Sequence, residues 1–185
     1  MKKRIPVMLL LTIISLYSCR DSSERITQEW VPGSEKNFIV AVDVIVPEDD
    51  NLSLYYRLNA KDDYRQNKPI WKAVKGSGKI QEVVFTLPEK VIPLEIRLDF
   101  GNNEAQKDIY INRIKMIYNQ NAFTAPGTLV FSYFRPDVRK TEFDAATGMI
   151  RGKIISGIRQ SPSLYPKEKL LSKQIELLIK ASQPK

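Results

Sequence analysis

The stretch LEIRLDF, residues 94–100, decides the fold class because its apolar and charged residues alternate strictly. Every even position is apolar, and the odd positions hold Glu95, Arg97 and Asp99. Successive side chains of a β-strand point to opposite faces of the sheet, so the pattern predicts a strand with one buried and one polar face. Such half-solvated strands are typical of antiparallel sheets.

Apolar residues alternate in the same way in several other segments, at residues 38–46, 52–58, 83–87 and 129–133. Residues rich in Pro, Gly, Asn and Asp separate them and are typical of turns. No helical pattern of useful length lies between these segments, which argues against a βαβ fold. The sequence therefore predicts a mostly β protein, an antiparallel β-sandwich, over residues 37–134.

Residues 109–118 alternate too, but their apolar phase shifts by one position between Ile111 and Ile114. A shift without loss of strand character predicts a β-bulge near Asn112 and Arg113.

The C-terminal residues 135–185 have a different character. Residues 135–166 are rich in Gly and Pro and predict a loop-rich tail with a short strand at residues 149–155. Residues 167–182 predict an amphipathic helix that begins just after Pro166. Its apolar stripe comprises Leu170, Leu171, Gln174, Ile175, Leu178 and Ile179. The stripe either packs on the sandwich or binds a protein partner.

The N-terminal residues indicate export. Three basic residues at positions 2–4 precede an apolar run at residues 5–17, which is shorter than the roughly 20 residues of a membrane-spanning helix. The run ends in Leu16-Tyr17-Ser18-Cys19. This segment resembles the lipobox of bacterial lipoproteins, which implies cleavage after residue 18 and lipidation of Cys19 with palmitate-type chains. The alternative is a plain signal peptide or a membrane anchor, with Cys19 incidental.

The residues after Cys19 bear on where the protein is placed. In lipoprotein sorting, Asp directly after the lipidated cysteine retains the protein at the inner membrane, and here Arg20 stands at that position. The resemblance thus implies a lipid-anchored protein of the cell envelope, at the outer membrane. Residues 19–36 are polar and contain a Pro-Gly step, and they predict a tether.

Composition excludes several kinds of chemistry. The chain of 185 residues has no histidine and one cysteine, so it has no Ser-His-Asp triad, no HExxH zinc site and no internal disulfide. Loss of residues 1–18 removes three basic residues and no acidic one, which lowers the formal charge from +8 to +5. That excess is spread along the chain without a basic run, so no nucleic-acid partner is expected.

A second resemblance covers the strands around LEIRLDF. The run LPEKVIPLEIRLDFGNN followed by IYINRIKMIY resembles jelly-roll domains of the galactose-binding-like type, which serve as carbohydrate-binding modules. The resemblance implies glycan binding on a sheet face or at loop tips, without catalysis. It identifies no binding residue in this chain. A structural or assembly lipoprotein that binds protein through the C-terminal tail is the alternative.

Candidate ligand-binding residues follow from the chemistry of sugars, which stack on aromatic rings and hydrogen-bond to planar polar groups. Aromatic candidates are Tyr55, Tyr64 and Trp71, and polar candidates are Arg57, Arg97 and Asp99. If the two strands that carry Tyr55 and Arg97 are neighbours, four of these residues form one patch. The alternative is an ordinary solvated sheet face with an Arg–Asp pair.

Other acidic residues suggest two further roles. Asp49, Asp50, Asp62 and Asp63 are candidate ligands for a structural calcium ion, although their spacing is not that of an EF-hand. Glycoside hydrolysis needs only two carboxylates, and Asp43, Glu95 and Asp99 are candidates by residue type. Nothing in their spacing supports catalysis, so we expect a protein that is not an enzyme and needs no cofactor.

Overall fold

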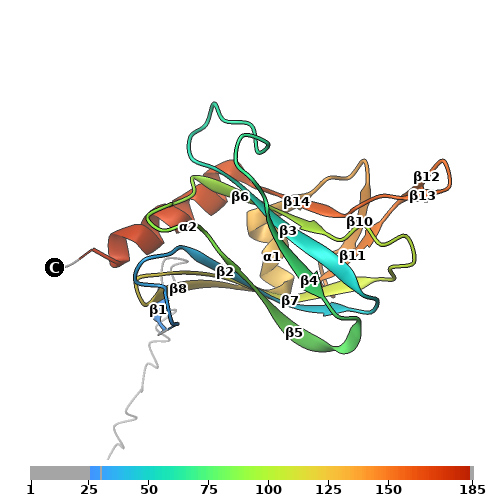
Figure 1. Ribbon diagram of the computed structural model, residues 1–185, viewed down its shortest axis with the longest axis horizontal. Coiled ribbons are helices and arrows are strands. Elements are labelled where there is room, and N and C mark those ends of the chain that lie inside the picture. The colour runs from blue at the N-terminus through green and yellow to red at the C-terminus, as the bar shows by residue number, and fades with distance from the viewer. Residues whose placement is uncertain (1–25, 30, 184–185) are drawn as a thin grey trace, which may run out of the picture.

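A computed structural model describes residues 26–29 and 31–183 and shows an antiparallel β-sandwich with two helices (Figure 1). One sheet has seven strands: β1 (Ile26–Gln28), β2 (Ile39–Val46), β5 (Ser77–Thr86), β7 (Ile109–Tyr118), β8 (Asn121–Pro126), β10 (Thr141–Asp144) and β11 (Met149–Gly152). The other has five: β3 (Asp50–Arg57), β4 (Ile70–Val74), β6 (Glu95–Phe100), β9 (Phe134–Pro136) and β14 (Ser163–Pro166). The predicted β-sandwich class is confirmed.

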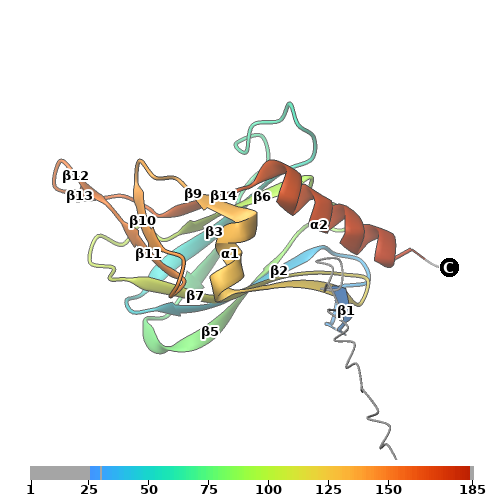
Figure 2. The same ribbon diagram turned by 180° about the vertical axis from the view of Figure 1, so that it is seen from behind.

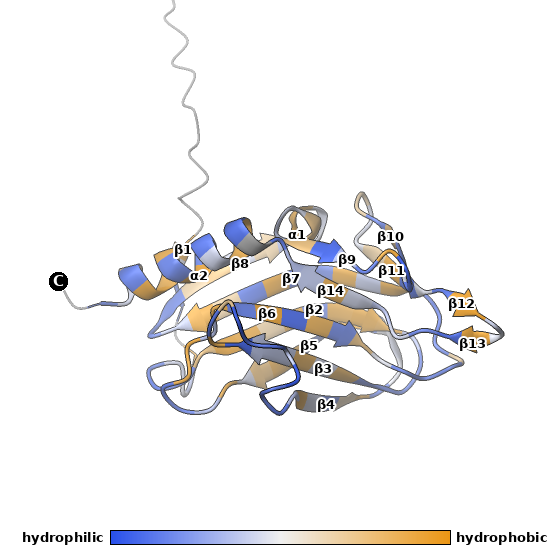
Figure 3. Ribbon diagram, turned by 90° about the horizontal axis from the view of Figure 1, so that it is seen from above, coloured by the Kyte–Doolittle hydropathy of each residue, from blue (hydrophilic) through white to orange (hydrophobic). Residues whose placement is uncertain are grey.

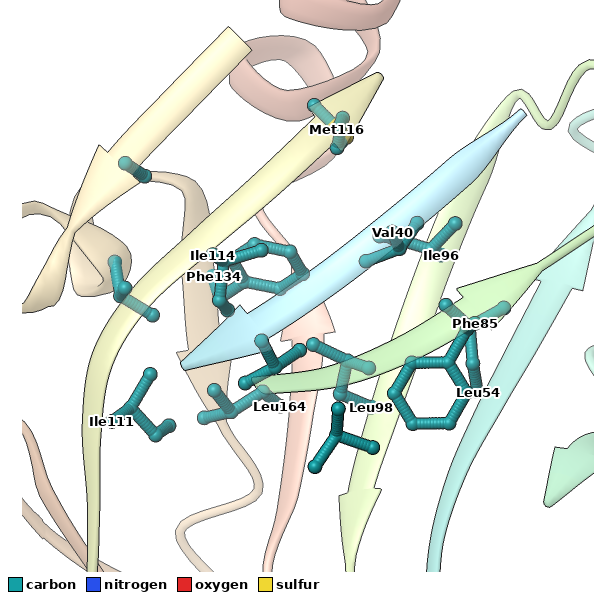
Figure 4. Close-up of a cluster of buried hydrophobic side chains, with 14 of the residues drawn as sticks. Val40, Leu54, Phe85, Ile96, Leu98, Ile111, Ile114, Met116, Phe134 and Leu164 are labelled. Carbon is teal, nitrogen blue, oxygen red and sulfur yellow. The ribbon is translucent and has the colours of Figure 1, made fainter. Parts of the chain in front are cut away.

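The core lies between the inner faces of the two sheets. Three of the four even residues of LEIRLDF, Ile96, Leu98 and Phe100, belong to β6 and are fully buried there, whereas Leu94 precedes the strand and is partly buried. They pack in one cluster with the even residues of β2, such as Val40, from the opposite sheet (Figure 4). The alternation in the sequence therefore follows the division between core and outer face.

The β-bulge is present at the predicted place. Asp43 of β2 pairs with Arg113 of β7, whereas the next residue, Val44, pairs with Ile111, so Asn112 is the extra residue. On the other edge of β7 the bulge separates two partners, because β8 pairs with residues 113–118 and β11 with residues 109–110. The bulge thus divides one long strand between two neighbours.

Residues 129–133 form no strand, and the prediction there was wrong. They lie in helix α1 (Gly127–Tyr133), which buries Val130, Phe131 and Tyr133. The helix connects β8 of one sheet to β9 of the other, so the chain must cross the sandwich here. Seven helical residues span about 10 Å, which matches the usual distance of about 10 Å between packed sheets.

The folded region is wider than residues 37–134. At the N-terminal side, β1 pairs with β8, Glu29 forms an ion pair with Lys115, and Val31 packs on the outer face of the seven-stranded sheet. The described part of the expected tether therefore belongs to the domain. The signal segment, Cys19 and the rest of the tether lie outside the described residues.

The expected loop-rich tail also completes both sheets. Strand β14 lies between β6 and β9, and β10 and β11 extend the larger sheet. A separate hairpin, β12 (Ile154–Ile155) and β13 (Ile158–Arg159), projects at one end of the molecule (Figure 3). These strands have two to four residues each, too few to show alternation.

Helix α2 (Glu168–Ala181) confirms the predicted C-terminal helix. Leu171, Ile175 and Leu178 are buried in the main core, and the helix packs against strands of both sheets (Figure 2). Most of the apolar stripe is therefore used within the molecule, while Leu170 remains 52% exposed. No described helix is long and apolar enough to span a bilayer.

Replacing a buried residue of this stripe should destabilise the whole sandwich. We expect Leu178→Ala to lower the free energy of unfolding by about 2–5 kcal/mol, because it leaves a cavity in the core. Leu170→Ala is the matched control and should change it by less than about 0.5 kcal/mol, since its side chain is exposed. Urea unfolding measures both. Equal losses of unfolding free energy in the two variants would contradict the packing of α2 in the core.

Candidate functional site

The predicted patch forms on the outer face of the five-stranded sheet. Strands β3 and β6 are neighbours, and Tyr55 pairs directly with Arg97 while Arg57 pairs with Glu95. Residues paired in this way point to the same side of a sheet. The same face continues onto β14 and β9, where Tyr165 pairs with Arg135. We call this surface the tyrosine–arginine face; its members are Tyr55, Arg57, Tyr64, Arg97, Asp99, Arg135 and Tyr165.

Arg97 lies between two tyrosine rings. Its guanidinium carbon is 4.6 Å from the ring centroid of Tyr55 and 4.9 Å from that of Tyr165. Arg135 follows on the same row, 5.2 Å from the Tyr165 centroid. A cation within about 6 Å of an aromatic centroid is attracted by the ring quadrupole. The row therefore alternates Tyr, Arg, Tyr, Arg across four strands.

Asp99 holds the Arg97 guanidinium in its plane. Nε of Arg97 donates to one carboxylate oxygen at 2.8 Å, and Nη2 donates to the other. Burial alone would lower the pKa of Arg97, but the hydrogen bonds and charge of Asp99 outweigh it, so the pKa is raised. Asp99 thus keeps the Arg97 side chain protonated and holds its guanidinium in one orientation.

A buried carboxylate fastens the loop between β3 and β4 to this face. Glu95 accepts hydrogen bonds from Nε of Arg57 at 2.7 Å and from the Tyr64 hydroxyl at 2.9 Å. Arg57 also donates to the carbonyl of Ala60 in the loop at 3.2 Å. Tyr64 meets Tyr165 edge-to-face, with centroids 6.0 Å apart. The loop, which rises beside β6 in Figure 1, therefore contributes a third ring to the face.

The loop and the sheet enclose an open hollow of about 520 Å³. Tyr64, Arg97 and Tyr165 line it together with charged loop residues such as Lys61 and Arg65. Trp71 shares the sheet face but lies on the edge strand β4, opposite Ser53, and is 53% exposed. Five of the six predicted residues thus come together, and Trp71 stands at the margin.

Two members of the tyrosine–arginine face were not predicted from the sequence, and one supporting residue, Glu95, was given another role. Tyr165 and Arg135 lie in strands of four and three residues that end at prolines, so no alternation marks them. Glu95 was considered only as a catalytic carboxylate, whereas it pairs with Arg57 and Tyr64. Its odd position in LEIRLDF already indicated that Glu95 lies on the outer face of the sheet, beside Arg97 and Asp99 in sequence.

The carboxylates considered for hydrolysis are not arranged as a pair. Asp43 belongs to the other sheet, where it forms an ion pair with Arg113. Glu95 and Asp99 lie on one face of one strand, four positions apart, which corresponds to about 13 Å. Known glycosidase pairs are about 5–9.5 Å apart. Each of the three carboxylates is also held by an arginine.

The aspartates considered for calcium are bound by groups of the protein. The buried Asp50 accepts from the backbone amides of Asn102 and Asn103, and Asp62 accepts from two amides of its own turn. Asp49 pairs with Lys75, and the Arg65 side chain and amide lower the pKa of Asp63 to about 2. Within the described ranges no group of three His, Cys, Asp or Glu residues could hold a metal ion.

Comparison with protein-family models, with curated proteins and with solved structures finds no significant match to this chain. The interpretation of the face therefore depends on its own geometry.

Removing the charge of Glu95 should release the loop. We expect Glu95→Gln to lower the free energy of unfolding by about 1.5–3 kcal/mol, because Arg57 and Tyr64 lose a buried charged acceptor. Amide hydrogen exchange of residues 58–69 should become faster. Asp63→Asn, in the same loop but exposed, is the control and should leave the free energy of unfolding almost unchanged. Unchanged loop exchange in Glu95→Gln would contradict the fastening role.

Proposed function

We propose that this chain is a lipid-anchored protein of the cell envelope that binds glycans without catalysis. The observation that carries the proposal is the row in which Arg97 is held between Tyr55 and Tyr165. The sequence resemblance to carbohydrate-binding jelly-roll domains agrees with this assignment.

The chemistry of the face suits a sugar. A sugar ring has an apolar C–H side that stacks on aromatic rings, and hydroxyl edges that need donors and acceptors in fixed places. Tyr64 and Tyr165 offer ring surface beside the hollow. Arg97 uses Nε and Nη2 for Asp99, and among the described residues its Nη1 has no hydrogen-bond partner. A donor whose orientation is already fixed loses little entropy on binding.

Glycan binding should depend on the rings and on the planar guanidinium. In calorimetry with envelope polysaccharides, we expect Tyr165→Ala to weaken binding about tenfold, because one stacking contact is worth about 1.5 kcal/mol. Arg97→Lys should weaken it by a similar factor, since an ammonium cannot replace the fork that faces Asp99.

The control for this experiment is Phe143→Ala, a partly exposed aromatic on strand β10 of the other sheet. Its affinity should equal that of the unaltered protein. The absence of binding to any polysaccharide of the envelope would overturn the proposal. Equal loss in all three variants would instead indicate a general effect on folding.

The anchor would hold the domain close to the membrane. The first described strand begins at Ile26, seven residues after Cys19. Seven extended residues reach at most about 25 Å. Several acyl chains on one cysteine would give stable attachment, since each buried CH₂ contributes about 0.8 kcal/mol. Because Arg20 rather than Asp follows Cys19, the resemblance to lipoprotein sorting signals makes the outer membrane the proposed location.

Lipidation can be tested directly with labelled palmitate. We expect the unaltered chain to incorporate the label and to sediment with membranes, and Cys19→Ala to lose both properties, because no other cysteine is available. Cys19→Ser serves as a second variant with a similar side-chain volume. Labelling that persists in both variants would exclude this attachment.

A second candidate function is assembly with a protein partner through the C-terminal part of the chain. The observation that favours it is the hairpin of β12 and β13, where Ile154, Ile155 and Ile158 are 66%, 45% and 56% exposed. Clustered apolar side chains on a projecting hairpin are typical of contact surfaces. Failure of the glycan experiment would leave this as the preferred function.

A further inference from the structure

A second hollow lies on the seven-stranded sheet, at the β-bulge. Its volume is about 420 Å³, and Tyr110, Asn112 and Ile45 line it together with the first residues of α1. It shares no lining residue with the hollow of the tyrosine–arginine face, which belongs to the other sheet. Ligand binding at the second hollow is therefore independent of the function proposed for that face.

The bulge shapes this hollow through the carbonyl of Ile111. A Cβ atom on Gly127 would lie 2.6 Å from that oxygen, and one on Gly148 would lie 2.4 Å from it. Gly148 also has φ +76°, which disfavours other residues there. Two glycines thus let the start of α1 and the turn between β10 and β11 approach β7 closely. The extra residue, Asn112, stands at the rim of the resulting concavity.

The lining has one apolar wall and several uncharged polar groups. Ile45 and Ile80 form the wall, and the ring of Tyr110 is 38% exposed beside them. Asn112, Thr128 and the Tyr110 hydroxyl supply polar groups, and none of the three side chains has a hydrogen-bond partner within the described parts of the chain. None of the described residues that line the hollow is charged.

Charge near the hollow is already balanced. Arg151 is close enough to Tyr110 for the two to interact electrostatically, but its guanidinium is held by Asp108 and lies near Glu142. An anionic ligand would therefore find Arg151 already paired. A purely apolar ligand would leave the amide of Asn112 and two hydroxyls without partners, which is unfavourable.

We propose that this hollow is a second binding site, specific for a neutral sugar ring. The C–H side of the ring packs against Tyr110 and Ile80, and its hydroxyls bond to Asn112 and Thr128. A hexose combines one apolar side with a hydroxyl edge, as the lining requires. Bulges often lie next to functional sites because they redirect side chains, and here the bulge presents Asn112.

Solution NMR of the protein tests the site with glucose, galactose, mannose and N-acetylglucosamine as separate probes. We expect saturable shifts at Tyr110, Asn112 and Thr128 with at least one of them. Tyr110→Ala should raise Kd about tenfold, because stacking is lost. Thr128→Val keeps the shape and should raise Kd about two- to tenfold through one lost hydrogen bond.

Glucuronate is the matched anionic probe, and we expect it to bind no more tightly than glucose. Shifts confined to Tyr55 and Tyr165, or no shift with any neutral sugar, would overturn the second site while leaving the first untouched. Tenfold preference for glucuronate would overturn the neutral ligand class. An unchanged Kd in Thr128→Val, whose fold is preserved, would remove Thr128 from the site.

Discussion

The register between β3 and β6 is the constraint on which the rest of the molecule depends. It places Leu54 opposite Leu98 on the inner face and Tyr55 opposite Arg97 on the outer face. A slip of one residue would exchange the two faces, exposing the core and burying the charged row. The burial of Ile96, Leu98 and Phe100 therefore fixes the position of the outer side chains as firmly as it fixes the core.

The outer face is assembled from segments that lie far apart in the chain. Its alternating row runs from Tyr55 through Arg97 and Tyr165 to Arg135, on four different strands. The antiparallel pairing of the strands alone places these residues side by side in one row across the sheet. Arg97 then joins the row to Asp99, while Glu95 joins it to the loop that carries Tyr64. Arg57 and Arg97 each have both a carboxylate partner and an aromatic neighbour, which restrict their orientation.

Apolar periodicity in the sequence predicted the long elements β2, β3, β6, β7 and α2, part of β5, and the bulge at Asn112. It did not predict β1, which lies in the expected tether, or β8. It failed at residues 129–133, where a short helix buries Val130, Phe131 and Tyr133, because so short an apolar segment does not distinguish a helix from a strand. It also missed Tyr165 and Arg135, whose strands are too short for a pattern. Tyr55 and Arg97 were predictable as a pair, since both lie on long alternating strands.

The side chains of the tyrosine–arginine face have a consequence for the environment in which the protein can work. Histidine is the residue whose ordinary pKa lies near neutrality, and the chain contains none. The central cation is an arginine whose pKa is raised further by Asp99. A surface built on arginine therefore keeps its cationic charge across the pH range in which a histidine would lose it.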